Sequence, residues 1–543
     1  MRKASWGTGL ALTLAATMVV AATLGSAANG ANSPRAGTQK SGGNITFGLE
    51  AETTDYCLSR AQLANSGIEV ATAIYEELTV PNDKGVAVPY LAKAVTPNTN
   101  FTQWTISLRP GISFQDGEPF NADAVKLNLD SYRGAPGAPN VGALFPIVLK
   151  FISDISVVDP MTVRVTLNTP VPDFPAYLSS GARVGMMAPA QINAGADCST
   201  KLIGTGPFKL QTYSQNEKTV VVRNPSYWQR GYPKADSITF VPVPDGSARD
   251  VQLQGGQLDM IQQRNATQID DLRKIGGQIK LLTQPPGYRE IDYYFLISAK
   301  APFNSQDART AFAEAVNRNE INQIRNKGTF DLANSLMDRS APGYLKNAGY
   351  PAFNLKKAQA LVSKVKAANG GQFNITLGTD TDPNDSAEAQ LLKEQLGNAG
   401  INAQIAQFDQ ATLINKALTR SIDVLLWRNL HGTYSDFNDA DTYPWFANTN
   451  LGYLTNFSGY NDPGTQQLLD QGRGASNLAT VKTIYQQFNR VMAQRGYLLP
   501  TWYVNWTIAY QSNVKLTLPP LPDGHGNART TDGIIPAIGL TKS

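Results

Sequence analysis

The stretch that decides the fold class is QFNITLGTDTDPNDSAEAQLLKEQLGNAGINAQIAQFDQATLINKALTRSIDVLLWRN, residues 372–429. Its short apolar runs alternate with runs of helical spacing. They predict strands at 372–380, 401–408 and 422–429, with helices at 386–400 and 411–420. A β-α-β-α-β order is typical of a parallel sheet covered by helices. The sequence therefore predicts an α/β fold.

The segment that continues from the third strand, LLWRNLHGTYSDFNDADTYPWF at residues 425–446, contains six aromatic residues and three aspartates. In open parallel sheets, ligands bind beyond the carboxyl ends of the strands. Rings there can cover an apolar or flat group, and a carboxylate can neutralise a ligand cation. We therefore expect the loop from Arg428 to bind a ligand. The alternative is a buried aromatic cluster with polar loops between the rings.

Patterns outside this stretch predict further elements. Asp307 and Asn354 are placed to cap two helices whose apolar residues recur at helical spacing. The run TWYVNWTIAY at 501–510 alternates with period two, which indicates one strand with a role in core or hinge packing.

Length and charge limit the classes of function. The chain has 543 residues, which is more than one hydrophobic core usually covers, so a cleft between lobes is expected. Its 47 basic and 43 acidic residues give a net charge of only +4. No basic footprint for nucleic acid is present.

The N-terminus has the layout of a secretory signal. Met1-Arg2-Lys3 precede an apolar run that ends in small residues, which predicts a signal peptide at 1–28 and a disordered leader at 29–43. The alternative is an uncleaved membrane anchor. No cysteine follows that could carry a lipid, so we expect an exported protein in the periplasm or at the cell surface.

Cys57 and Cys198 are the two cysteines of the chain. In an oxidising compartment a lone pair is most simply a disulfide, here closing a loop of about 140 residues. The alternative is two unrelated buried thiols.

Catalytic and metal-binding motifs are largely missing from the sequence. His431 and His525 are the only histidines, no H-E-x-x-H pair occurs, and no serine lies in a G-x-S-x-G elbow. The S-x-x-K match at 363–366 falls within a predicted helix and lacks its companion motif. Spacing alone does not exclude a pair of catalytic carboxylates. We expect no cofactor and no His- or Cys-bound metal.

One long stretch, WTISLRPGISFQDGEPFNADAVKLNLDSY at 104–132, resembles the most recurrent signature of the extracytoplasmic solute-binding proteins of the peptide and nickel class, which serve ABC transporters. The likeness continues in the same order through IGTGPFKL, VVVRNPSYW, GYPKADSITF, VQLQGGQLDM, KAPFNSQDARTAFAEAVNRNEI, LKKAQALV, FSGYNDPGTQQLLD and YQQFNRVMAQRGYLLPTWY. These blocks span about residues 44 to 510.

The resemblance implies a bilobed periplasmic-binding-protein-like fold of type II with an extra subdomain and a ligand cleft between the lobes. The implied bounds are 44–88, 204–288 and 500–543 for the core of lobe I, 89–203 for its extra subdomain and 289–499 for lobe II.

The resemblance also implies a binding site. In peptide-binding relatives, an aspartate shortly after a strand-end tryptophan pairs with the α-ammonium of the ligand. Trp427 matches that tryptophan, and Asp436, in the step Ser435-Asp436-Phe437, matches the aspartate. Several extra residues separate them here, so Asp439 and Asp441 remain alternatives. The other candidates for ligand contact are Arg428, Asn429, His431, Tyr434 and Phe437.

Together these features predict a receptor that is not an enzyme. We expect a monomer that binds a short peptide or peptide-like solute and delivers it to the permease subunits of an ABC transporter. Within the same fold, a metal chelate, a haem-like ligand, an opine or an oligosaccharide are alternative ligands. A hydrolase of cell-envelope peptides or glycans is the alternative from a different class.

Overall fold

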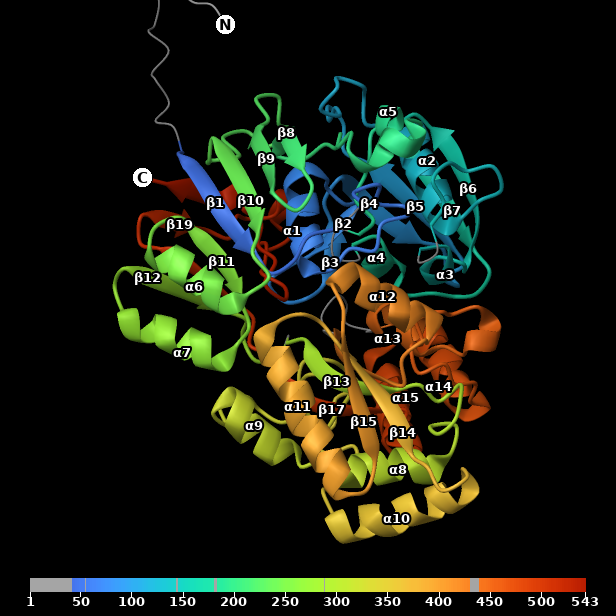
Figure 1. Ribbon diagram of the computed structural model, residues 1–543. Coiled ribbons are helices and arrows are strands. Elements are labelled where there is room, and N and C mark those ends of the chain that lie inside the picture. Colours follow the sequence, from blue (N-terminus) through green and yellow to red (C-terminus); the bar gives the residue numbers. More distant parts are fainter. Residues whose placement is uncertain (1–41, 54, 143–144, 180–182, 288, 430–438) are drawn as a thin grey trace, which may run out of the picture. The chain divides into compact units, whose positions relative to one another are not determined.

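The computed structural model describes residues 42–543 except for 54, 143–144, 180–182, 288 and 430–438 (Figure 1). All described residues belong to one compact unit. The expected signal peptide, 1–28, and most of the expected leader, 29–43, lie outside them.

The largest sheet has seven strands in the order β12-β18-β11-β1-β10-β9-β8. Its central strand β1 runs parallel to both neighbours, and the other pairs are antiparallel. In β1, Ile45, Phe47 and Leu49 alternate along the strand and are all buried. The bounds are β1 (Asn44–Leu49), β8 (Phe208–Ser214), β9 (Lys218–Arg223), β10 (Ser237–Pro242), β11 (Met260–Gln263), β12 (Ile279–Thr283) and β18 (Thr507–Gln511).

Three smaller sheets adjoin this part of the chain. A four-stranded antiparallel sheet has the order β4 (Ala92–Pro97), β5 (Gln103–Leu108), β7 (Thr162–Leu167) and β6 (Ile152–Asp159). The two-stranded sheets pair β2 (Thr79–Pro81) with β3 (Ala87–Pro89) and β19 (Val514–Leu516) with β20 (Leu540–Lys542). The predicted disulfide between Cys57 and Cys198 is present, with the two Cα atoms 5.1 Å apart.

The deciding stretch of the sequence forms most of a five-stranded sheet in the order β15 (Asn402–Gln407), β14 (Asn374–Thr379), β16 (Val424–Asn429), β13 (Ile291–Leu296) and β17 (Leu498–Tyr503). The three strands predicted from that stretch are parallel to one another. The sheet as a whole is mixed, because β13 runs antiparallel to both β16 and β17.

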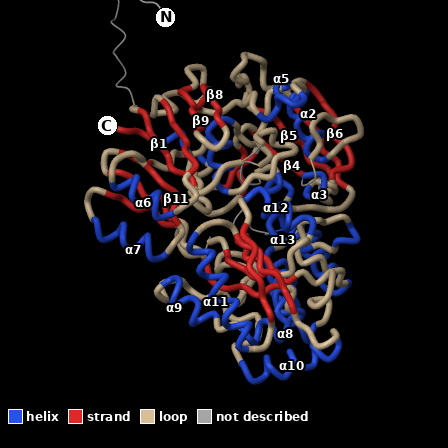
Figure 2. The backbone as a smooth tube through the Cα atoms, in the orientation of Figure 1, coloured by secondary structure: helices blue, strands red, loops and turns tan. Residues whose placement is uncertain are grey.

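The helices cover these sheets (Figure 2). Helix α11 packs on β14 and β15, α15 packs on β17, and α8 packs on α10. The helix bounds are α1 (Asn65–Ile74), α2 (Ala122–Arg133), α3 (Phe145–Val148), α4 (Phe174–Tyr177), α5 (Pro189–Ile192), α6 (Gly246–Gln254), α7 (Ala266–Ile275), α8 (Gln306–Ala315), α9 (Arg318–Asn326), α10 (Leu355–Ala368), α11 (Pro383–Asn398), α12 (Gln410–Thr419), α13 (Asp439–Phe446), α14 (Pro463–Gly474) and α15 (Leu478–Arg495).

Two large hydrophobic cores hold this unit together. The first core gathers buried side chains from 45–260 and 508–540, around the seven-stranded and four-stranded sheets. The second core gathers side chains almost entirely from 291–506, around the five-stranded sheet. The lobe bounds expected from the resemblance stay a prediction.

The structure corrects two local expectations. The run 501–510 is not one strand, because the chain leaves the five-stranded sheet at the end of β17 and enters the seven-stranded sheet at the start of β18. Residues on both sides of the break are buried, among them Trp502, Tyr503, Thr507 and Ile508, so burial does not alternate along this run. Asp307 is not a cap either: α8 begins at Gln306, so Asp307 lies in its first turn.

Candidate functional site

A cavity lies between the two cores and takes lining residues from both. Glu50 and residues 62–65 come from segments of the first core, whereas Asp292, Trp427 and Trp445 come from the second. The volume of the cavity, counted as the space that the centres of water molecules can occupy, is about 100 Å³. One water needs roughly 10–15 Å³ by this measure, so the space holds several waters or a compact ligand group.

Polar residues gather where strands of both sheets end. Glu50 directly follows β1 and Arg264 directly follows β11, and these two strands are parallel neighbours. On the other side, Asp380 directly follows β14, whose parallel neighbour β16 carries Arg428 as its next-to-last residue. The carboxyl ends of parallel strands meet at one sheet edge, which is where α/β folds bind ligands.

Helix α11 adds an acidic face to the same edge. Its N-cap residue Asp382 accepts a hydrogen bond from the backbone of Asn384, and Pro383 occupies the first helical position. Asp385 and Glu388 lie three residues apart, so they share one face of the helix. Both are buried or nearly so, with 13% and 3% of their side chains exposed.

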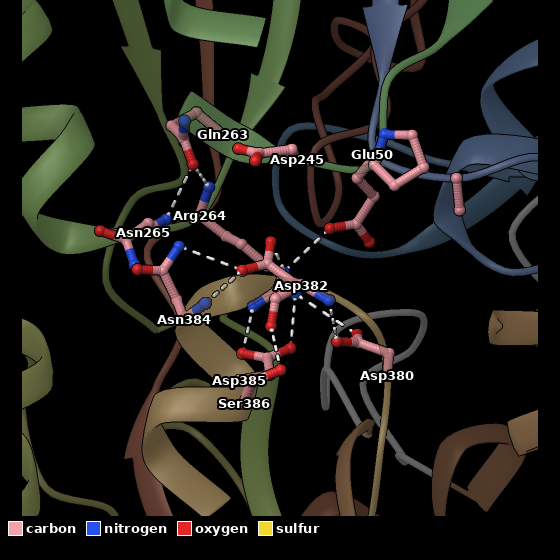
Figure 3. Close-up of polar contacts among 12 residues, drawn as sticks. Glu50, Asp245, Gln263, Arg264, Asn265, Asp380, Asp382, Asn384, Asp385 and Ser386 are labelled. Atoms are coloured by element: carbon pink, nitrogen blue, oxygen red, sulfur yellow. Dashed lines mark hydrogen bonds and ion pairs between the residues drawn. The ribbon is translucent and has the colours of Figure 1, made fainter. Parts of the chain in front are cut away.

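Arg264 joins the first core to this acidic edge (Figure 3). Its Nε donates to Glu50 at 2.8 Å, while its two Nη atoms donate to the two carboxylate oxygens of Asp385 at 3.0 and 2.7 Å. Asp380 and Asp382 lie 3.5 and 3.7 Å from the same guanidinium group. A two-pronged arginine–carboxylate pair fixes orientation as well as distance. Arg264 therefore ties the two halves of the cavity to each other.

Arg428 joins β16 of the five-stranded sheet to Glu50. Its Nη2 lies 3.1 Å from the carboxylate of Glu50, and its guanidinium group lies over the ring of Trp506 at 5.2 Å. Burial alone would raise the pKa of Glu50, but the guanidinium groups of Arg428 and Arg264 outweigh it and lower that pKa to about 2. Glu50 is therefore ionised at neutral pH and held from both sides.

Arg325 of α9 is the third arginine of this network. It donates to Asp385 at 2.6 Å and lies 2.9 Å from Glu388, which also accepts a hydrogen bond from the Tyr294 hydroxyl. Burial opposes ionisation of Asp385, yet Arg264 and Arg325 together hold its pKa well below the ordinary range. Burial dominates at Glu388 and raises its pKa to about 7.

Asp292 is the one carboxyl of the cavity wall without a bonded partner in the described part of the chain. Its side chain is 6% exposed and lines the cavity. In the antiparallel register of β13 and β16 it stands opposite Arg428, whose Nη2 is already held by Glu50. Burial raises the pKa of Asp292 well above its ordinary value, and the carboxyl groups of Glu388 and Asp385 raise it further.

Aromatic rings form another part of the wall. Trp427, Trp445 and Phe457 all line the cavity, and the ring of Phe457 meets those of Trp427 and Trp445 edge-on at 5.1 and 5.8 Å. Flat apolar surfaces beside a few charged groups are typical of small-molecule sites.

The structure accounts for part of the predicted site. Trp427 and Arg428 line the cavity, and Asn429 ends β16 at the same edge. Four predicted contact residues lie outside the described residues: His431, Tyr434, Asp436 and Phe437.

The two alternatives to Asp436 lie away from the cavity lining, and both are buried. Asp439 accepts hydrogen bonds from the hydroxyls of Tyr177 and Tyr485 at 2.7 and 2.9 Å, and from Arg473 at 3.1 Å. Tyr177 belongs to the first core, so this contact also connects the two cores. Such a saturated carboxylate stabilises the fold rather than a ligand.

Local sequence patterns did not predict the residues of the network that lie away from Trp427 in the sequence. These are Glu50, Arg264, Asp292, Arg325, Asp380, Asp385 and Glu388. A signal for two of them exists, because Glu50 and Asp380 are acidic residues placed immediately after apolar strand-like runs, NITFGL and NITLGT. No local pattern shows that these two positions meet.

Within the described ranges, no set of three or more His, Cys, Asp or Glu side chains is arranged to hold a metal ion. Nor does any helix there combine the length and the hydropathy that a membrane crossing requires.

Relatives in sequence agree with a solute-binding role. The chain is 27% identical to the Glutathione-binding protein GsiB of Shigella dysenteriae. The match covers 82% of this chain and 86% of that relative. The protein of the same name from Escherichia coli O6:K15:H31 is 30% identical, but that match covers 63% of this chain and 65% of the relative.

Solved structures share the fold. A periplasmic binding protein of Agrobacterium in complex with agropinic acid superposes with a TM-score of 0.81 at 23% identity, covering 92% of this chain and 99% of the other. A second structure is the ABC transporter-associated periplasmic binding protein DppA of Helicobacter pylori in complex with the peptide STSA. Its TM-score is 0.80 at 19% identity, and the match covers 93% of this chain and 99% of the other. At such identities the likeness shows the fold alone, which is the expected α/β periplasmic-binding-protein fold of type II.

A family model described as "Bacterial extracellular solute-binding proteins, family 5 Middle" matches residues 86–453, more than half of the chain. The relatives are binding receptors rather than enzymes. The chain belongs to family 5 of the bacterial extracellular solute-binding proteins.

Proposed function

We propose that this receptor captures a short peptide or a peptide-like solute in the cavity between the two cores and delivers it to the permease of an ABC transporter. The observation that carries the proposal is the cavity itself, which takes lining residues from both cores, includes the Arg428–Glu50 ion pair in its wall and has the Arg264–Asp385 ion pair beside it. A site of this kind can enclose a ligand when the cores approach and release it when they separate.

The chemistry of the wall supports a peptide-like ligand. Charged groups stand beside the rings of Trp427, Trp445 and Phe457. A peptide offers the matching set: charged ends, backbone amides and side chains of varied polarity. Proteins of the same fold have been crystallised with the peptide STSA and with Met-Leu, and the relatives in sequence carry the name glutathione-binding protein. In the binding role we include Asp436, Asn429, His431, Tyr434 and Phe437, as the resemblance implies.

An opine is the second candidate, because the fold is shared with a protein bound to agropinic acid. The cavity offers both carboxylates and guanidinium groups, which suits a compact ligand with charges of both signs.

Native mass spectrometry of the mature chain, purified from its own host, tests the proposal. A spread of added masses that matches short peptides supports a peptide receptor. A single mass that matches an opine or a metal chelate would instead assign the cavity to one discrete solute. If no solute is retained and none of a panel of peptides, opines and chelates binds, the proposed function fails.

The same preparation tests the export and assembly expectations. N-terminal sequencing should find the chain cleaved near Ala28, and light scattering should give the mass of a monomer. Loss of uptake of the identified solute, on deletion of the receptor alone, tests the delivery step.

A further inference from the structure

The wall of the cavity has an imbalance of charge. Among the described residues, six carboxyl side chains line it but only two guanidinium groups, those of Arg183 and Arg428. The six are Glu50, Glu290, Asp292, Asp380, Asp385 and Glu388. Arg264 and Arg325 stand behind the wall and hold Glu50, Asp385 and Glu388 in ion pairs. Each arginine of the network therefore already holds another carboxylate, and Nη1 of Arg428 is left without a hydrogen bond among the described residues.

Asp292 is left over in this arrangement. Its side chain is 94% buried, it reaches the cavity surface, and the described residues supply it with neither a hydrogen bond nor an ion pair. The charged groups that face it are Glu388 and Asp385 from α11, Arg325 from α9 and Arg428 from β16. Buried carboxyl groups are normally hydrogen-bonded, because burial without a partner is costly. A missing partner on the wall of a binding cavity points to one supplied by the ligand.

Resting on the proposed function, we infer that Asp292 is the partner of a protonated nitrogen of the solute, so that the receptor selects solutes carrying an ammonium or guanidinium group at this end of the cavity. A basic side chain and the α-ammonium of a peptide, for which the resemblance implies Asp436, offer the same chemistry, and the experiment below tells which of the two Asp292 holds.

The raised pKa of Asp292 fits this role. Without a cation, burial and the neighbouring carboxyl groups keep the proton on Asp292. When a protonated nitrogen arrives, it replaces that proton, and a charge-assisted hydrogen bond forms in its place. Binding of the solute should therefore release a proton to the solvent, which a purely structural aspartate would not do.

Four tripeptides serve as probes: Ala-Ala-Ala, Ala-Lys-Ala and the N-acetylated form of each. They are titrated by calorimetry into the wild type, Asp292→Asn and the control Asp250→Asn. Asp250 is also a carboxyl with a pKa raised by burial, to about 6, but it lies outside the cavity wall. If the α-ammonium is the partner, acetylation weakens binding to the wild type. If a basic side chain is the partner, lysine strengthens binding even in the acetylated peptides.

In the wild type, the dissociation constants of the charged and uncharged probes should differ by roughly 10- to 150-fold, which is the range expected for a hydrogen bond between charged groups. This difference should persist in Asp250→Asn and vanish in Asp292→Asn. Repeating the titration in phosphate and in Tris should show proton release for the wild type and Asp250→Asn, and none for Asp292→Asn. If Asp292→Asn keeps the full discrimination, or if the wild type shows none, the inference is overturned while the receptor function stands.

A second measurement covers the case in which no tripeptide binds. The solute released from the wild-type receptor purified from its own host is treated with amine- and guanidine-reactive reagents. The inference is supported if that solute has a reactive nitrogen and if Asp292→Asn, purified in the same way, carries none of the solute. A solute without a basic nitrogen overturns the inference and leaves solute binding intact. If no preparation carries a solute and none of the wider panel binds, the proposed function fails, and the inference fails with it.

Discussion

The ion pair between Arg264 and Asp385 is expected to be a major link between the two cores. It is tested by a double-mutant cycle of Arg264→Gln and Asp385→Asn. The two hydrogen bonds of the pair measure 3.0 and 2.7 Å, and the side chains are only 5% and 13% exposed. Hydrogen bonds to charged groups contribute about 1.5–3 kcal/mol each, but burying both charges offsets part of this. We expect a coupling energy of about 2–4 kcal/mol.

The assay is urea unfolding of the wild type, both single variants and the double variant at pH 7, followed by tryptophan fluorescence and circular dichroism. A matched control is the pair Arg223 and Asp236, changed in the same way. That pair measures 2.7 Å but lies within the seven-stranded sheet region, with side chains 27% and 35% exposed. Exposed pairs couple by less than about 1 kcal/mol. A coupling energy for Arg264 and Asp385 no larger than that of the control would refute the reasoning.

The same variant should also change the distance between the cores. Arg264 follows β11 of the seven-stranded sheet, and Asp385 lies on α11, which packs on the five-stranded sheet, so their hydrogen bonds form only while the cores are together. Small-angle scattering of ligand-free Arg264→Gln should give a larger radius of gyration than that of the wild type, and Arg223→Gln should leave it unchanged. Equal radii for wild type and Arg264→Gln would show that other contacts, such as Asp439 with Tyr177, suffice to hold the cores together.

Three further outcomes are expected. Burial raises the pKa of Glu69 from 4.5 to about 8, so its contribution to stability is fully present below pH 4.5 and is lost as the pH rises to about 8. At about 1.4 kcal/mol per pKa unit the full loss is roughly 5 kcal/mol, and Glu69→Gln should flatten the fall of Tm between pH 5 and 8; an unchanged slope would contradict this. Asp436→Ala should abolish binding of a free-amino peptide and leave the Tm of the empty protein nearly unchanged, whereas unchanged affinity would exclude the role implied by the family. The unreduced mature protein should show no thiols under denaturing conditions, and reduction of the Cys57–Cys198 bond should lower the free energy of unfolding by up to about 4–5 kcal/mol; two titrating thiols would rule out the bridge.

The sequence by itself determined the class of the fold. Residues 372–429 carry periods of two and of 3.6 that depend only on local geometry, and these placed β14, β15 and β16 with the helices between them. The ordered family blocks then indicated a solute-binding receptor, in agreement with the family match. The edge of the sheet that bears Trp427 and Arg428 also followed from the sequence, because the carboxyl ends of parallel strands share one edge.

The tertiary structure alone decided which charges face each other. Glu50, Arg264 and Asp385 are separated by more than a hundred residues at each step, and no periodicity relates positions on different sheets. Their meeting depends on how the seven-stranded and five-stranded sheets are placed across the cavity. The same holds for Asp292, which reads locally as a polar residue in an apolar strand. It becomes a candidate for ligand recognition only because the arginines around it are engaged by other carboxylates.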